Sequence, residues 1–170
     1  MKKLTRMKLI NWHRFENCTI DFGDSTLISG ENGAGKSTLL DAIQFVVTCS
    51  ANAFNKAAHE NGKRKLTGYV RCKTGKESRP YERTGQISAY IALEFYEESK
   101  ERYFIVGAVV DSASEGQETT GRYLIDNKRI TAVSYTHLDV YKRQQRFPEQ
   151  ERAGCNEGYE DCPGDVCERI

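Results

Sequence analysis

The sequence has almost no excess charge and no long apolar run. Its 25 Lys and Arg residues nearly balance 24 Asp and Glu residues, which leaves a net charge of +1. No field of one sign therefore surrounds the chain, and any basic surface for nucleic acid or membrane must be local. The apolar stretches are far shorter than the roughly 20 residues that a membrane-spanning helix needs. A length of 170 residues leaves room for one domain with a real core.

Signals for export and paired cysteines are also missing. Residues 1–6 are basic, but the apolar stretch of a signal peptide does not follow them. This predicts a cytoplasmic protein without a membrane partner. Cys18, Cys49 and Cys72 are scattered singly, and in a reducing compartment we expect them to be small apolar side chains rather than disulfides or ligands. The chain contains neither an internal repeat nor a heptad run.

A glycine-rich stretch is the most informative feature that is present. Residues 30–37 read Gly-Glu-Asn-Gly-Ala-Gly-Lys-Ser, a complete G-x-x-x-x-G-K-[ST] phosphate-binding loop. A short β-type run at residues 25–29 precedes it, and an apolar helix over residues 39–47 follows. The glycines allow positive φ, so that loop N–H groups and the helix N-terminus can face a phosphate chain.

The same loop predicts ATP and Mg²⁺ as ligands. Lys36 is expected to reach the β- and γ-phosphates, and the Ser37 hydroxyl is expected to bind Mg²⁺. The predicted phosphate-binding residues are Gly30, Asn32, Gly33, Ala34, Gly35, Lys36, Ser37 and Thr38.

The rest of the chain reads as an α/β fold. Six segments have the alternation or β-branched content of strands: 4–10, 18–22, 25–29, 88–96, 102–111 and 122–126. A charged turn between the fourth and fifth predicts a hairpin. Residues 52–83 are polar and irregular, with weak helical character at 53–59. The expected architecture is a core that opens β-β-β-α, with an antiparallel β subdomain after it.

Three strings resemble the amino-terminal half of an ATPase head from the SMC, SbcC and RecF relatives within the ABC class. They are Lys-Leu-Ile-Asn-Trp-His-Arg-Phe at 8–15, Ile-Asp-Phe at 20–22, and the loop with Ser-Thr-Leu-Leu-Asp-Ala-Ile at 30–43. Residues 68–71 and 90–95 are similar to the JetC and MukB-like branch, whose members sit in condensin-type complexes that act against plasmids. The resemblance covers residues 1 to about 130.

This resemblance implies a P-loop NTPase fold, the amino-terminal lobe of an ABC/SMC-type head over residues 1–130. It also implies pairing with a second head, double-stranded DNA as a partner, and kleisin-like or nuclease subunits. By analogy His13, Arg14 and Phe15 contact the adenine or the triphosphate. The alternative for these three is a strand-to-turn corner that buries Trp12 and Phe15 in the core.

Motifs for hydrolysis are absent from the sequence. No apolar strand ends in Asp-Glu, as a Walker B motif requires, and no Ser-Gly-Gly signature occurs. We therefore expect an ATPase in the full-length protein and an inactive fragment here, because phosphoryl transfer depends on positioned charges. Two rival functions remain, the nucleotide-binding subunit of an ABC transporter and a nucleotide-binding regulator that does not hydrolyse. The sequence does not distinguish among roles in DNA repair, loop extrusion and plasmid defence.

Residues 52–84 are unusually basic, with nine Lys and Arg residues against three Glu residues. Clustered positive charge is what contacts to a DNA backbone need, whereas the ordinary alternative is a solvated loop. The predicted DNA contacts are Lys63, Arg64, Lys65, Arg71 and Lys73.

The last segment, residues 131–170, does not continue the pattern. Residues 133–144 back-translate to a DNA sequence that is nearly its own reverse complement and resembles two head-to-head transposon ends from sequencing libraries. We expect the gene to diverge from this sequence at or just before Val133. The cysteines beyond form C-x6-C-x4-C, which lacks the close pair of a zinc site, and the tail is assigned no function.

Overall fold

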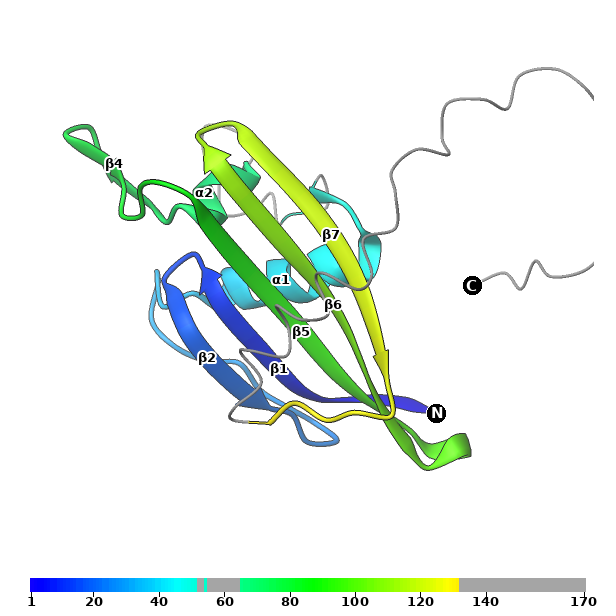
Figure 1. The fold of residues 1–170 in the computed structure, drawn as a ribbon. Helices are drawn as coiled ribbons and strands as arrows, with labels where there is room; N and C mark the ends of the chain where they lie inside the picture. Colours follow the sequence, from blue (N-terminus) through cyan, green and yellow to red (C-terminus); the bar gives the residue numbers. More distant parts are fainter. Residues whose placement is uncertain (52–53, 55–64, 132–170) are drawn as a thin grey trace, which may run out of the picture.

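An antiparallel sheet with a helix on one face forms the main part of the described structure. The computed structural model describes residues 1–51, 54 and 65–131. Five strands follow the order β2-β1-β5-β6-β7, and helix α1 crosses one face of this sheet (Figure 1). The sheet consists of β1 (Lys2–Trp12), β2 (Phe15–Asp21), β5 (Ile87–Glu97), β6 (Arg102–Ser114) and β7 (Gln117–Asp126). The remaining elements are α1 (Lys36–Thr48), α2 (Leu66–Val70), β3 (Lys73–Lys76), β4 (Arg79–Tyr81) and the 3-10 turn η3 (Glu98–Lys100).

The core lies between the sheet and α1. Alternate residues of a strand point to opposite faces of the sheet. In β1 and β5 every second residue therefore faces the helix, and many of these residues are apolar. The fully or almost fully buried side chains of this face include Met7, Leu9, Ile91, Leu93, Ala108 and Val110. Helix α1 contributes Ala42, Phe45 and Val46 to the same cluster, which fixes one face of the helix against the strands.

The hairpin expected over residues 88–111 is confirmed as β5 and β6, which pair without a register shift from Ile87↔Ser112 to Glu97↔Arg102. Strand β7 continues it, and β1 and β2 form a second hairpin. The expected separate β subdomain is wrong in one respect. Strand β1 pairs with β5 as well as with β2, so both hairpins belong to a single sheet and share one core.

The strand expected before the glycine-rich loop is also corrected. Residues 25–29 form no strand, and the side chain of Leu27 is 89% exposed. A strand needs a neighbour to complete its ladder of hydrogen bonds. Among the described residues no strand pairs with residues 25–29, so this run forms no ladder despite its β-type composition.

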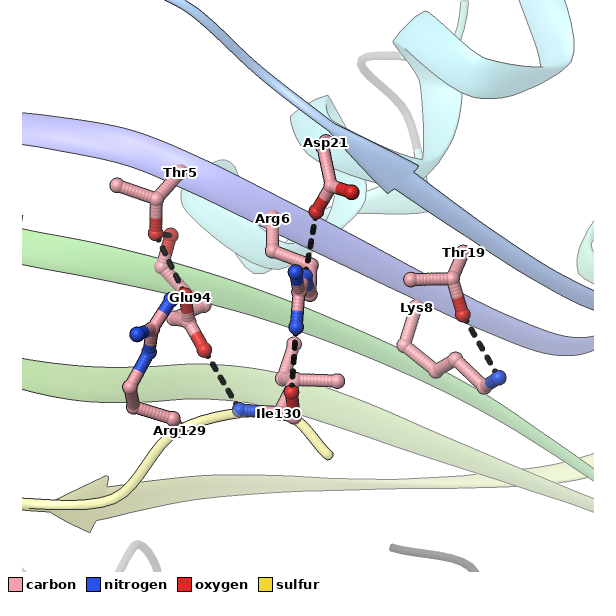
Figure 2. A network of polar contacts seen from close by, with 8 residues as sticks. All are labelled: Thr5, Arg6, Lys8, Thr19, Asp21, Glu94, Arg129 and Ile130. Carbon is pink, nitrogen blue, oxygen red and sulfur yellow. Dashed lines mark hydrogen bonds and ion pairs between the residues drawn. The ribbon is translucent and has the colours of Figure 1, made fainter. Parts of the chain in front are cut away.

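The opposite face of the sheet carries a polar network that holds residues 127–131, which we call the strap (Figure 2). Glu94 of β5 is fully buried and accepts hydrogen bonds from Thr5 Oγ1 at 2.8 Å and from the Ile130 N–H at 2.6 Å. Arg6 donates to the Ile130 carbonyl at 2.8 Å and to Asp21 at 2.5 Å. The strap is therefore fastened through both backbone groups of one residue.

Small elements lie within residues 52–83, which the sequence predicts to be irregular. Helix α2 packs near the ends of β1 and β5, and the hairpin of β3 and β4 projects away from the sheet (Figure 1). The helical character expected at 53–59 falls outside the described residues except at residue 54, which is a bend, and the tail at 132–170, with its adaptor-like residues 133–144, lies outside them entirely. In the part of the chain that is described, no helix is long and apolar enough to cross a membrane.

Candidate functional site

The glycine-rich loop has the backbone that its sequence predicts. Gly30, Gly33 and Gly35 have φ of 152°, 83° and 103°, values that residues with a side chain rarely adopt. Gly35 also lies against an aromatic ring, because a Cβ added there would stand 2.9 Å from Phe15 Cζ. The last glycine is therefore required both for its conformation and for space.

Helix α1 begins directly after this loop with its N-terminal end uncapped. Gly35 stands at the N-cap position, and among the described residues no side chain caps the helix and no acidic residue occupies its first turn. The free N–H groups of a helix start and its positive dipole end attract anions. Since the first turn itself carries no negative side chain, this end of α1 suits a phosphate.

Lys36 folds back on the loop. Its Nζ donates to the carbonyls of Gly30 at 2.6 Å and Glu31 at 2.9 Å. The ammonium group is thus held on the first two residues of the glycine-rich loop. Ser37 beside it is half-buried, whereas Thr38 is 5% exposed and turned into the protein. Any contribution of Thr38 to phosphate binding therefore comes from its backbone.

The turn between β1 and β2 lies against the loop. Arg14 Nη1 donates to the Gly33 carbonyl at 2.5 Å, and the Phe15 ring contacts Gly35. Of the two alternatives for this corner, the burial of Trp12 at 0% exposure fits the packing role. Arg14 is exposed beside the loop and half-buried Phe15 lies on its last glycine, so contact with a nucleotide remains a prediction for them.

His13 is held by the backbone of α2 and by an arginine. Its N–H donates to the Tyr69 carbonyl at 2.6 Å, and its carbonyl accepts from Arg83 Nη1 at 2.7 Å. The residue has a φ of 51°, a strained conformation for a side-chain-bearing residue. Both backbone groups of His13 are thus fixed, one by Tyr69 of α2 and the other by Arg83.

Two buried contacts beneath the loop were missed by the sequence reasoning. The indole Nε1 of Trp12 donates to the Thr38 carbonyl at 3.1 Å, and the Tyr69 hydroxyl donates to the Asp41 carboxylate. Asp41 is 0% exposed and shares the buried face of α1 with Thr38 and Phe45. An acidic residue on the apolar face of a helix was the available signal, because a buried carboxylate needs a donor.

The predicted DNA contacts divide into three groups. Lys65 and Lys73 are exposed, while Lys63 and Arg64 lie outside the described residues. The prediction for Arg71 is corrected. Arg71 is 5% exposed, and its guanidinium donates to the Ser112 hydroxyl and the Gly85 carbonyl, each at 3.0 Å. It joins α2 to β6 and presents no surface to a duplex.

The three cysteines in the described part are free thiols, as expected. Burial, with a contribution from Glu82, raises the pKa of the Cys72 thiol to about 11, so it stays protonated at neutral pH. Within the described ranges no group of three or more His, Cys, Asp or Glu residues could hold a metal ion. The Ser37 hydroxyl therefore remains the candidate ligand for Mg²⁺, which in such sites is shared with phosphate oxygens and water.

Comparison with known proteins bears on the same region. Residues 4–61 match a family model described as the P-loop containing region of an AAA domain. Comparison with curated proteins found no match. The match includes β1 from residue 4 onward, β2, the glycine-rich loop and α1. The sequence motif, the loop geometry and this match agree that the chain carries a P-loop nucleotide-binding region similar to that of AAA domains.

Proposed function

We propose that the chain is the ATP-binding amino-terminal lobe of an SMC/SbcC-like head ATPase, which couples ATP binding and hydrolysis to DNA handling. The observation that carries the nucleotide part is the uncapped start of α1 after three positive-φ glycines, together with the Lys36 ammonium held on the Gly30 and Glu31 carbonyls of the same loop. Bound Mg²⁺ would neutralise phosphate charge, and the Ser37 hydroxyl is the group of this chain that would hold it.

The corner at residues 11–15 supports the finer assignment. The SMC and SbcC relatives are the families that the Asn-Trp-His-Arg-Phe string resembles, and here this string packs on the phosphate loop through Arg14 and Phe15. Bound ATP would meet Arg14 beside the loop, and the guanidinium could exchange the Gly33 carbonyl for a phosphate oxygen. A full-length protein of this kind would pair two heads, with kleisin-like or nuclease subunits attached.

Substitution of Lys36 tests the nucleotide site. We expect Lys36→Ala to weaken Mg-ATP binding about 10- to 100-fold, because one charge-assisted hydrogen bond to phosphate is removed. Titration with a fluorescent ATP analogue measures the affinity, and circular dichroism checks the fold. Lys100→Ala is the matched control, since Lys100 is a 59% exposed lysine on η3. Equal affinity of Lys36→Ala and the parent would refute the site.

The DNA part of the proposal rests on the exposed basic residues around α2 and the projecting hairpin. Lys65 precedes α2 and Lys73 opens β3, and both side chains are exposed. Lys63 and Arg64 are adjacent in sequence to Lys65. Phosphate contacts require accessible cations rather than a particular motif, and Arg71, being buried, takes no part in this surface.

Charge reversal tests the DNA surface. Replacing Lys63, Arg64, Lys65 and Lys73 by Glu should weaken binding to duplexes of any sequence. It should also lower the slope of log affinity against log salt by about 0.9 for each phosphate that is no longer neutralised. Fluorescence anisotropy over a salt series measures both quantities, with Lys100→Glu on the β5–β6 turn as control. An unchanged slope would make this segment an ordinary solvated surface.

A further inference from the structure

Trp12 joins the sheet to the first turn of α1. Its side chain is 0% exposed, and its indole stacks between Phe45 at 5.8 Å and Tyr69 at 4.7 Å, measured between ring centroids. The ring is therefore fixed in the core. Its Nε1 donates to the carbonyl of Thr38, the residue that follows the two predicted ligands Lys36 and Ser37.

Tyr69 makes a second connection, from α2 to the same helix. Its hydroxyl donates to the Asp41 carboxylate, which is buried one turn beyond Thr38. The two aromatic residues stack on each other and hold α1 at two points along one face. One point is a backbone carbonyl and the other is a side chain, so both the rotation and the axial position of the helix start are constrained.

We infer that Trp12 and Tyr69 are positioning residues of the nucleotide site, which set the start of α1 so that its N–H groups, Lys36 and Ser37 converge on the phosphates. This inference rests on the proposed function. Neither side chain faces the loop. Their effect passes through Thr38 and Asp41, whose buried positions leave the opposite side of the first turn to the ligand.

The position of the helix start matters because its contribution to phosphate binding is directional. Backbone N–H groups that end a fixed helix are already oriented when the anion arrives, so no ordering cost is added at binding. Releasing one of the two contacts would let the first turn move relative to Gly33 and Gly35. The ligand groups would then be present but misplaced, which lowers affinity without unfolding the protein.

Two conservative variants of the full 170-residue chain test this inference. Trp12→Phe keeps an aromatic ring and removes the N–H donor, and Tyr69→Phe keeps the ring and removes the hydroxyl. Each should weaken Mg-ATP binding about fivefold, as expected for one hydrogen bond, at a temperature where all variants are folded. Tyr103→Phe and Ile105→Val, both on β6, serve as controls. The first removes a remote hydroxyl, and the second lowers stability in the cluster on the strap's face of the sheet, away from α1.

The outcomes separate the two proposals. Weaker binding by both test variants, with parental affinity in both controls, supports the positioning role. Parental affinity in Trp12→Phe and Tyr69→Phe despite their lower melting temperatures, together with weakened binding in Lys36→Ala, would overturn this inference and leave the nucleotide site standing. If the parent chain binds no Mg-ATP, the proposed function and the inference fall together.

Discussion

Phe15 limits what can stand at the last glycine of the phosphate loop. Its ring occupies the space into which a side chain at position 35 would point, while position 33 has the same kind of backbone and nothing within 4 Å of an added Cβ. Gly33 is therefore required only for its backbone conformation, whereas Gly35 is required for its conformation and because a side chain there would overlap Phe15. The Phe15 ring thus restricts the residue at position 35 in addition to the backbone conformation of the loop.

Alanine substitutions should resolve these two reasons. We expect Gly33→Ala to cost about 1–2 kcal/mol in the free energy of unfolding, the usual strain of positive φ. Gly35→Ala should cost about 1–3 kcal/mol more, because the methyl group overlaps Phe15. Urea denaturation measures both values. Equal costs for the two variants would show that the ring moves aside freely.

Sequence alone predicted residue roles where local chemistry decides them. Positive φ at the loop glycines follows from the motif, and the structure has it. Arg71 was misassigned because its charge suggested solvent, while its neighbour in space, Ser112, lies 41 positions away in the chain. Tyr69 and Asp41 were overlooked for the same physical reason, since their contact depends on how α2 packs against α1.

At the scale of elements, the strap at residues 127–131 fastens the end of the last strand to the middle of the sheet. Glu94 is the centre of this attachment, since it accepts from β1 and from the strap, and Arg129 lies 3.6 Å from its carboxylate. A carboxylate with no exposed surface is held there only because donors surround it. The strap and strands β1 and β5 therefore behave as one unit.

Neutralising this carboxylate tests the unit. Glu94→Gln keeps the shape but turns one acceptor into a donor that faces the Thr5 hydroxyl or the Ile130 N–H. We expect a decrease of about 1–3 kcal/mol in the free energy of unfolding, measured by chemical denaturation. Glu16→Gln, at an exposed position of β2, should change stability little. A similar small effect at Glu94 would mean that the strap is loosely attached.

Elements were predictable where the chain pairs with its near neighbours. The hairpins of β1 with β2 and of β5 with β6 show alternation and a turn, both of which are local signals. The run at 25–29 has the same composition and forms no strand, because pairing depends on a neighbour that no local pattern reveals. The insertion of β1 beside β5 was missed for the same reason, and with it the single sheet.

For the whole molecule, binding of a nucleotide and its hydrolysis depend on different groups. The sequence has no apolar strand that ends in Asp-Glu and no Ser-Gly-Gly signature. Positioned charge on both sides of the transferred phosphoryl group is what accelerates the reaction. The loop described here supplies donors from one side, through α1 and Lys36.

We therefore expect the 170-residue chain to bind Mg-ATP and to hydrolyse it no faster than the uncatalysed background. Phosphate release over several hours, with heat-treated protein and Lys36→Ala as controls, measures this rate. Turnover that disappears in Ser37→Ala but persists in Lys100→Ala would contradict the expectation. It would also mean that this chain holds a catalytic carboxylate.

The place of β1 in the sheet also has a kinetic consequence. Its pairing with β5 joins residues that are far apart in the sequence, such as Leu9 and Ile91, whereas β5, β6 and β7 are joined by short turns. Short hairpins close within microseconds, while distant strands meet late because closing a long loop costs entropy.

Trp12, the single tryptophan, lies at the end of β1. During refolding its fluorescence should therefore change after the far-ultraviolet dichroism of the β5–β7 strands has appeared. We expect the stacking of Trp12 on Tyr69 to form only in that late step, so a half-folded chain would lack this support of α1. Nucleotide would then slow unfolding of the finished protein and leave the early rate of folding unchanged.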